Sequence, residues 1–71
     1  MKSRRQHLAW CRGRALKYLD GGDVASAILT MNQDLTRHPQ TKPNPARVLQ
    51  ALKIVRDDNA DEARVWIEGF R

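Results

Sequence analysis

A chain of 71 residues with a formal net charge of +5 has room for one domain, so we expect residues 1–71 to fold as a single unit. Chains of this size bury about 60% of the surface that the unfolded chain exposes, so the core is thin. The single Cys11 excludes an internal disulfide, and no run approaches the roughly 20 apolar residues of a membrane span. We therefore expect a soluble protein of a reducing, intracellular compartment.

Positive charge is concentrated at the start of the chain. The cations that precede the first acid, at position 20, are Lys2, Arg4, Arg5, Arg12, Arg14 and Lys17. This asymmetry can attract nucleic acid, anionic lipid or an acidic protein surface, but it is also typical of a solvated helix face. Residues 1–6 form a basic N-terminal segment, and the sequence leaves open whether it is ordered.

The first half of the chain predicts two helices joined by a tight corner. The two apolar stripes run through Leu8, Cys11, Ala15 and Leu19, and through Val24, Ala27, Ile28, Met31 and Leu35. Gly21-Gly22 separates them, and Asp23 stands at the N-cap position of the second helix. A phosphate loop needs more glycines in a longer spacing, and a calcium loop needs a ladder of acids, so the glycine pair indicates a corner.

The second half predicts two further helices. A proline-rich loop over residues 40–45 ends in Asn44-Pro45, which fits an N-cap and a first helical residue. The apolar side chains that we expect to face inward from the third helix are Val48, Leu49, Leu52 and Val55. After a break at residues 57–59, the last helix is expected to bury Ala63, Trp66, Ile67 and Phe70. Since no segment alternates like a strand, the predicted fold is all-α, a small bundle of about four helices.

Residues 8–39 resemble a single tetratricopeptide repeat. The residues that match the repeat are the small Ala15 and Ala27, the aromatic Tyr18, the turn residue Gly22, the large Met31 and the closing Pro39. Cys11 stands where the repeat usually has tryptophan, and Asp34 where it usually has alanine. The resemblance implies an N-terminal tetratricopeptide-like antiparallel hairpin. It does not imply a binding groove, because repeat arrays need about three units.

A longer stretch is similar to a group of short phage and prophage proteins. It reads HLAWCRGRALKYLDGGDVASAILTMNQDLTRHPQT, and the tail IEGF belongs to the same pattern. Its features are the Trp-Cys opening, the Arg-Ala-Leu-x-Tyr hairpin start, the Gly-Asp turn and the Asp-Leu-x-x-His-Pro close, whereas residues 42–61 depart from it. The group has no settled activity. The resemblance implies a phage-encoded protein made in the cytoplasm of a bacterial host.

Few side chains in the sequence suggest metal binding or catalysis. His7 and Cys11 lie four residues apart on one helical face, and His38 joins them only if its loop folds back. Structural zinc takes four ligands, and a Cys–His nucleophile needs a third group to orient the histidine. The paired acids within residues 57–62 surround a helix break, where capping explains them. We therefore expect no enzyme activity, no metal and no cofactor.

The leading functional hypothesis is a small accessory protein that binds and modulates a host protein, with transcription or defence machinery as possible targets. The predicted partner-binding residues are Arg4, Arg5, Trp10, Arg12, Arg14 and Lys17. Tryptophan and arginine dominate binding hot spots, so an exposed Trp10 would anchor such an interface, although packing of Trp10 on the C-terminal helix explains it equally well. The basic patch predicts a partner with an acidic surface.

Two alternatives remain open at this stage. The first is a DNA- or RNA-binding protein that uses the third helix, where Arg47, Gln50, Lys53 and Arg56 recur every three residues on a roughly shared face. Contacts to phosphate would make its binding fall steeply with salt. The second is a homodimer, because a thin core leaves apolar surface, which we place on the Ile54 side.

Overall fold

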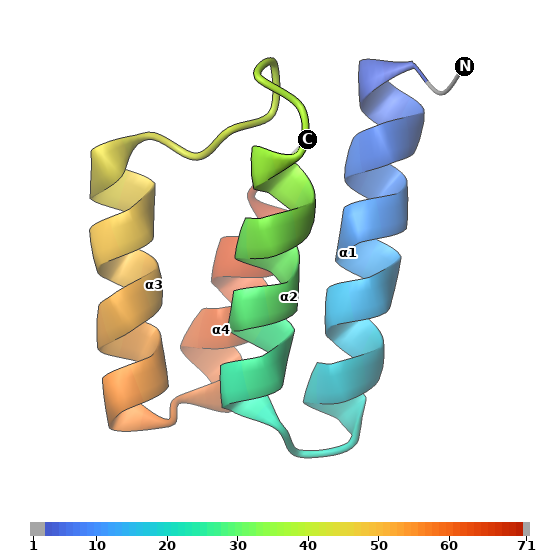
Figure 1. Ribbon diagram of the computed structural model, residues 1–71. Helices are drawn as coiled ribbons and strands as arrows, with labels where there is room; N and C mark the ends of the chain where they lie inside the picture. Colours follow the sequence, from blue (N-terminus) through green and yellow to red (C-terminus); the bar gives the residue numbers. More distant parts are fainter. Residues whose placement is uncertain (1–2, 71) are drawn as a thin grey trace.

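The computed structural model describes residues 3–70 as a bundle of four helices (Figure 1). The helices are α1 (Arg4–Asp20), α2 (Val24–Thr36), α3 (Pro45–Asp57) and α4 (Ala60–Glu68). The predicted all-α bundle is therefore confirmed. Within residues 3–70, no helix is both long enough and apolar enough to cross a membrane.

The helices run up and down with α2 and α4 between α1 and α3 (Figure 1). α1 packs on α2 and α4, and α3 packs on the same two helices. One end of the bundle holds the α1–α2 and α3–α4 turns, and we call it the turn end. The opposite end holds the start of α1, the end of α4 and the α2–α3 loop, and we call it the loop end.

α1 starts inside the segment whose order the sequence left open. Ser3 is its N-cap, and the Ser3 hydroxyl accepts a hydrogen bond from the Gln6 N–H at 3.2 Å. The Gln6 side chain accepts in return from the Ser3 N–H at 3.0 Å, which completes a capping box. Residues 4–6 are therefore helical, while residues 1–2 lie outside the described part of the chain.

The predicted corner between α1 and α2 is confirmed. Gly22 has φ +84°, a left-handed conformation that glycine adopts without steric cost. Asp23 caps α2 by accepting the Ser26 N–H at 3.0 Å. Hydrogen bonds from the Ser26 backbone, and then from its side chain, hold the pKa of the Asp23 carboxyl below its ordinary value.

The remaining helix ends also follow the sequence. The Asn44 side chain accepts the Arg47 N–H at 2.9 Å and starts α3, with proline as the first helical residue. α3 ends at Asp57, and the next residue, the C-cap Asp58, has a left-handed φ of 51°. The Asn59 side chain then accepts the Glu62 N–H at 3.1 Å, so α4 begins almost at once and folds back on α3.

The core forms from the apolar stripes predicted for α1, α2 and α4. The buried residues of these stripes are Leu8, Cys11, Ala15, Leu19, Val24, Ala27, Ile28, Met31, Leu35, Ala63, Trp66 and Ile67, with Phe70 partly buried against them. Ala15 and Ala27, one on each helix of the hairpin, are fully buried. Small side chains at these positions let the two helices approach closely.

The inward face predicted for α3 is wrong for Leu49 and Leu52, whereas Val48 and Val55 are partly buried and Val55 packs against the core. Leu49 and Leu52 are 67% and 60% exposed, and the buried side chains are Ala51 and Ile54. α3 lies at the edge of the bundle and, among the described helices, packs only on α2 and α4, so it buries one narrow side. The Trp66 indole of α4 donates from Nε1 to the Arg47 carbonyl at 3.1 Å, which helps to fix the rotation of α3.

Candidate functional site

Trp10 lies on the outer side of the hairpin and is partly buried against the core. Its ring stacks on that of His7, with centroids 6.0 Å apart and planes 24° from parallel. The guanidinium carbon of Arg14, one turn along α1, lies 4.8 Å from the Trp10 ring centroid on a cation–π contact. Trp10 is therefore contacted by a neighbour one turn before it and one turn after it, and it is only partly buried.

Arg14 is itself held by a buried acid on the neighbouring helix. Its Nε lies 3.2 Å from Oδ2 of Asp34, whose side chain is 2% exposed while that of Arg14 is 43% exposed. The backbone carbonyl of Asp34 accepts a hydrogen bond from Nε2 of His7 at 3.1 Å. One residue of α2 thus positions both neighbours of Trp10.

Further residues extend this surface along α1. Lys17 and Tyr18 follow Arg14 by three and four residues, so they share its side of the helix, and Tyr18 is 44% exposed. We call Trp10, Arg14, Lys17 and Tyr18 the Trp10 face. It combines two aromatic rings with two cations on one rigid helix.

The other predicted partner-binding residues do not join the Trp10 face. Arg12 reaches across to the C-terminal segment, where its Nη1 donates to the Phe70 carbonyl. Arg5 precedes Arg12 by seven residues and shares that flank of α1, while Arg4 lies at the loop end. The predicted patch is therefore divided among separate surfaces, and Trp10, Arg14 and Lys17 are the members that the fold brings together.

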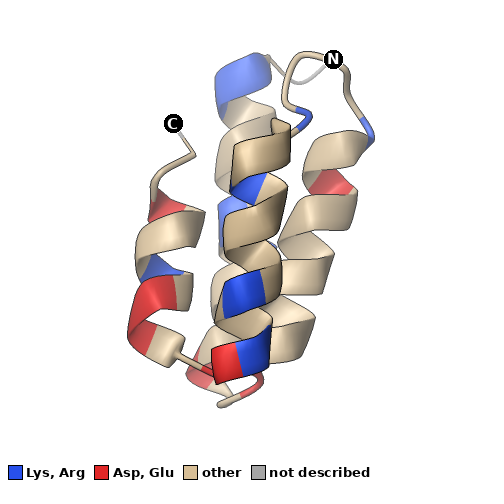
Figure 2. Ribbon diagram, turned by 90° about the vertical axis from the view of Figure 1, so that its left-hand side faces the viewer, with Lys and Arg blue, Asp and Glu red and all other residues tan. Residues whose placement is uncertain are grey.

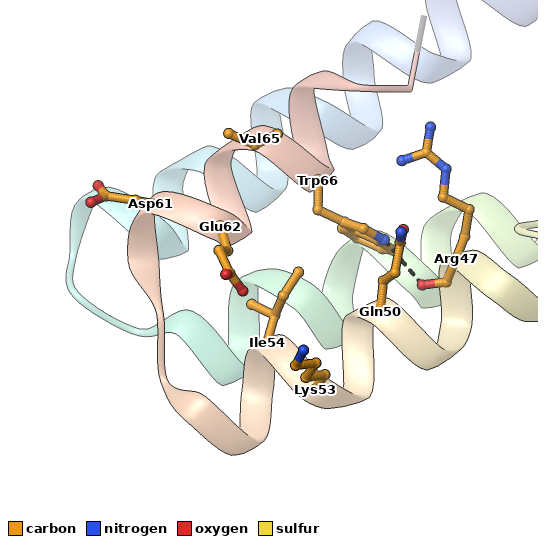
Figure 3. Close-up of a pocket in the computed structure, with 8 residues that line it drawn as sticks. All are labelled: Arg47, Gln50, Lys53, Ile54, Asp61, Glu62, Val65 and Trp66. Carbon is orange, nitrogen blue, oxygen red and sulfur yellow. Dashed lines mark hydrogen bonds between the residues drawn. The ribbon is translucent and has the colours of Figure 1, made fainter.

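The alternative nucleic-acid face lies on a groove between α3 and α4 of about 470 Å³ (Figure 3). Arg47, Gln50 and Lys53 line one side of this groove, but Asp61 and Glu62 line the other. Arg56, the fourth predicted residue, pairs with its neighbour Asp57 through an Nε–Oδ1 distance of 3.1 Å. Acids beside the cations weaken the attraction of this face for a phosphate backbone.

His38 does fold back onto the first helix. Its ring meets the His7 ring edge-on with centroids 4.2 Å apart, and Nε2 of His7 lies 3.5 Å from the buried sulfur of Cys11. Nevertheless, no group of three His, Cys, Asp or Glu side chains within residues 3–70 has the geometry to hold a metal ion. The contacts place these residues in support of Trp10.

The apolar surface that suggested a homodimer is not on the Ile54 side, because Ile54 is 5% exposed. The exposed leucines of α3 lie on the adjoining side instead, and the homodimer itself stays a prediction.

Sequence reasoning missed the role of Asp34, although it noted its unusual position. Asp34 lies three residues after Met31 and seven after Ala27, so it falls on a buried stripe and requires a cation on the partner helix. The register of the hairpin decides which arginine pairs with Asp34.

No family model, curated protein or solved structure matches the chain.

Proposed function

We propose that this is a non-enzymatic phage accessory protein that binds a host protein through the Trp10 face. The observation that carries the proposal is the partly buried Trp10 ring, which His7 and Arg14 both contact. Tryptophan, tyrosine and arginine are the residues most enriched in binding hot spots. Because these side chains are already ordered, a partner would lose little entropy by fixing them.

The resemblance to short phage proteins suggests that the partner is a protein of a bacterial host. Transcription and defence machinery are the classes of target that we propose. Arg14 and Lys17 make the Trp10 face basic, which favours a target with an acidic surface. Nucleic acid is the less favoured partner, because acids line the α3 groove and an acid pairs with Arg56.

Capture from host lysate tests the proposal. The immobilised full chain is exposed to bacterial lysate with and without nuclease, beside the variants Trp10→Ala and Leu49→Ala. Leu49 is exposed on α3, so it is a matched control for loss of an apolar side chain elsewhere. We expect one host protein to remain after nuclease treatment, to be retained by Leu49→Ala and to be lost with Trp10→Ala.

Calorimetry with the captured protein then measures its affinity for the chain and for the variants. Loss of a hot-spot tryptophan costs 2 kcal/mol or more, so Trp10→Ala should weaken binding by about 30-fold or more in calorimetry. Far-UV circular dichroism of each variant establishes that it remains folded. Capture that disappears with nuclease and is indifferent to Trp10→Ala would refute the proposal and favour nucleic acid.

A further inference from the structure

The outer side of α3 carries an exposed stripe with the spacing of a helix-pairing seam. Leu49 and Leu52 are more than half exposed, and among the described helices only α2 and α4 pack on α3. Pro45 and Arg56 extend the stripe by four residues at either end, and both are exposed. Steps of four, three and four residues keep side chains on one side of a helix and separate the contact positions of a coiled coil. We call Pro45, Leu49, Leu52 and Arg56 the Leu49 stripe.

Further apolar surface lies beside the Leu49 stripe. Val48 and Val55 are only partly buried, and their positions on the helix place them at the border of the stripe nearest the core. Lys53 is exposed and lies at the other border. The stripe therefore has an apolar centre with charge at its edge, which is the anatomy of a protein interface.

The two ends of the bundle differ in charge. Six of the eight acidic residues lie at the turn end, where Figure 2 shows the acidic positions gathered, and they are Asp20, Asp23, Asp57, Asp58, Asp61 and Glu62. Of the other two, Asp34 pairs with Arg14 and Glu68 ends α4. Residues 1–19 and 35–56 contain no acid, and the start of α1, the α2–α3 loop and the start of α3 lie at the loop end. The turn end is therefore acidic, and cations predominate at the loop end.

α3 has the same polarity within a single helix. Lys42 lies three residues before its first residue, whereas Asp57 and Asp58 lie at its end. Arg56 pairs with Asp57 through an Nε–Oδ1 distance of 3.1 Å, so two acids outnumber one cation there. The peptide dipoles act in the same sense, because the start of a helix is its positive end. α3 is therefore positive at the loop end and negative at the turn end.

An antiparallel pair of α3 helices matches both the apolar and the charged parts of this side. A twofold axis midway between Leu49 and Leu52 places each Leu49 against Leu52 of the partner copy. The same axis brings Asp57 and Asp58 to the positive start of the partner copy's α3. In a parallel pair, by contrast, Lys53 would face Lys53 of the partner copy and acids would face acids, and like charges disfavour that arrangement.

We propose that two copies of this chain associate through the Leu49 stripe as an antiparallel twofold dimer. The net charge of +5 on each copy opposes association, and the antiparallel arrangement offsets this by placing each acidic turn end beside the basic loop end of the other copy. One helix face is smaller than the interface of an obligate dimer, so the dimer is weak and forms only at high protein concentration. At the dilute concentrations of unfolding measurements the chain is a monomer. The Trp10 face lies on α1 and takes no part in this dimer.

Sedimentation equilibrium of the full chain, from micromolar to millimolar concentration, tests the association. We expect the average mass to rise with concentration toward that of two chains. Leu52→Glu places two carboxylates per dimer against apolar side chains, so it should weaken association by about 100-fold or more. Leu52 is exposed in the monomer, so the variant keeps its fold, which far-UV circular dichroism establishes.

Val65→Glu is the matched control for this loss of association. Val65 is exposed on α4 and lines the α3–α4 groove, so it is not part of the Leu49 stripe. We expect Val65→Glu to associate like the wild type. A mass that stays at one chain at every concentration would overturn the proposal, and so would equal weakening by Leu52→Glu and Val65→Glu.

Paramagnetic broadening in NMR spectra tests the orientation of the two copies. An Ala60→Cys variant carries a nitroxide at the turn end, where residue 60 is exposed, and burial protects Cys11 from labelling. Mixed with isotope-labelled wild-type chain, it should broaden the amides of residues 42–44, at the loop end of the partner copy. Broadening of residues 57–60 of the partner copy instead would contradict the antiparallel arrangement.

Discussion

At the scale of single residues, the ion pair between Arg14 and Asp34 links stability to the proposed binding surface. Asp34 is buried and Arg14 is about half exposed, so the two partners do not contribute equally. A buried carboxylate without its cation is strongly destabilising, whereas a half-exposed arginine without its acid returns to water at little cost. The buried Asp34 carboxylate therefore depends on Arg14 for its stability more than Arg14 depends on Asp34.

Arg14→Ala should accordingly destabilise the protein by about 1–3 kcal/mol, because it strands the Asp34 carboxylate in the core. The measurement is the urea midpoint of unfolding. Lys17→Ala, a loss of charge from an exposed position on the same side of α1, should change stability by no more than about 0.5 kcal/mol.

Adding Asp34→Asn to Arg14→Ala tests whether the unpaired charge of Asp34 causes the loss of stability. If the stranded charge is responsible, the double variant recovers part of the lost stability. A double variant less stable than Arg14→Ala alone would show that the packing of Asp34, and not its charge, sets the cost.

At the scale of elements, α3 differs from the other helices in how it uses its apolar residues. Its apolar arc is wider than the side that the bundle covers, so it buries Ala51 and Ile54 while Leu49 and Leu52 face solvent. The edge position of α3 leaves no neighbour over the leucines within the described structure.

Two substitutions on α3 test this rotation. Ile54→Ala should cost about 2 kcal/mol or more, because it leaves a cavity in the core. Leu52→Ala, two residues away, should stay within about 0.5 kcal/mol, since its side chain is exposed. Urea unfolding of both variants gives the comparison, and the opposite ranking would restore the inward face predicted from the sequence.

The same contrast explains what the sequence could and could not predict. In α1, α2 and α4 the buried side chains follow the predicted stripes, although Leu29 and Val65 lie off them and are exposed, so periodicity identifies the buried face. In α3 they span two adjoining faces, and the choice is made by Trp66 of another helix, which periodicity does not include. Periodicity could not predict the Trp10 face either, because Arg14 is positioned by Asp34 on the other helix of the hairpin. The pocket lined by Arg4, Lys42 and Arg47 combines three segments far apart in the chain, and these residues share no sequence motif.

At the scale of the whole molecule, the thin core implies that the two halves depend on each other. The α1–α2 hairpin buries its apolar stripes partly against Ala63, Trp66 and Ile67 of α4, which belong to the same core cluster. Since a chain of this size buries only about 60% of its unfolded surface, neither half has apolar area to spare.

We therefore expect all four helices to unfold in one cooperative transition. In a Trp10→Phe variant, Trp66 is the sole tryptophan and reports on the contact of α4 with the core, while far-UV circular dichroism reports on all helices. The two signals should give the same urea midpoint. As a control for the substitution, the dichroism transition of the variant should be as cooperative as that of the wild type. If dichroism persisted beyond the fluorescence transition, the hairpin would be a separate folding unit, as the tetratricopeptide-like pattern alone would allow. Coincident transitions would instead show that α3 and α4 help to stabilise the hairpin that carries the Trp10 face.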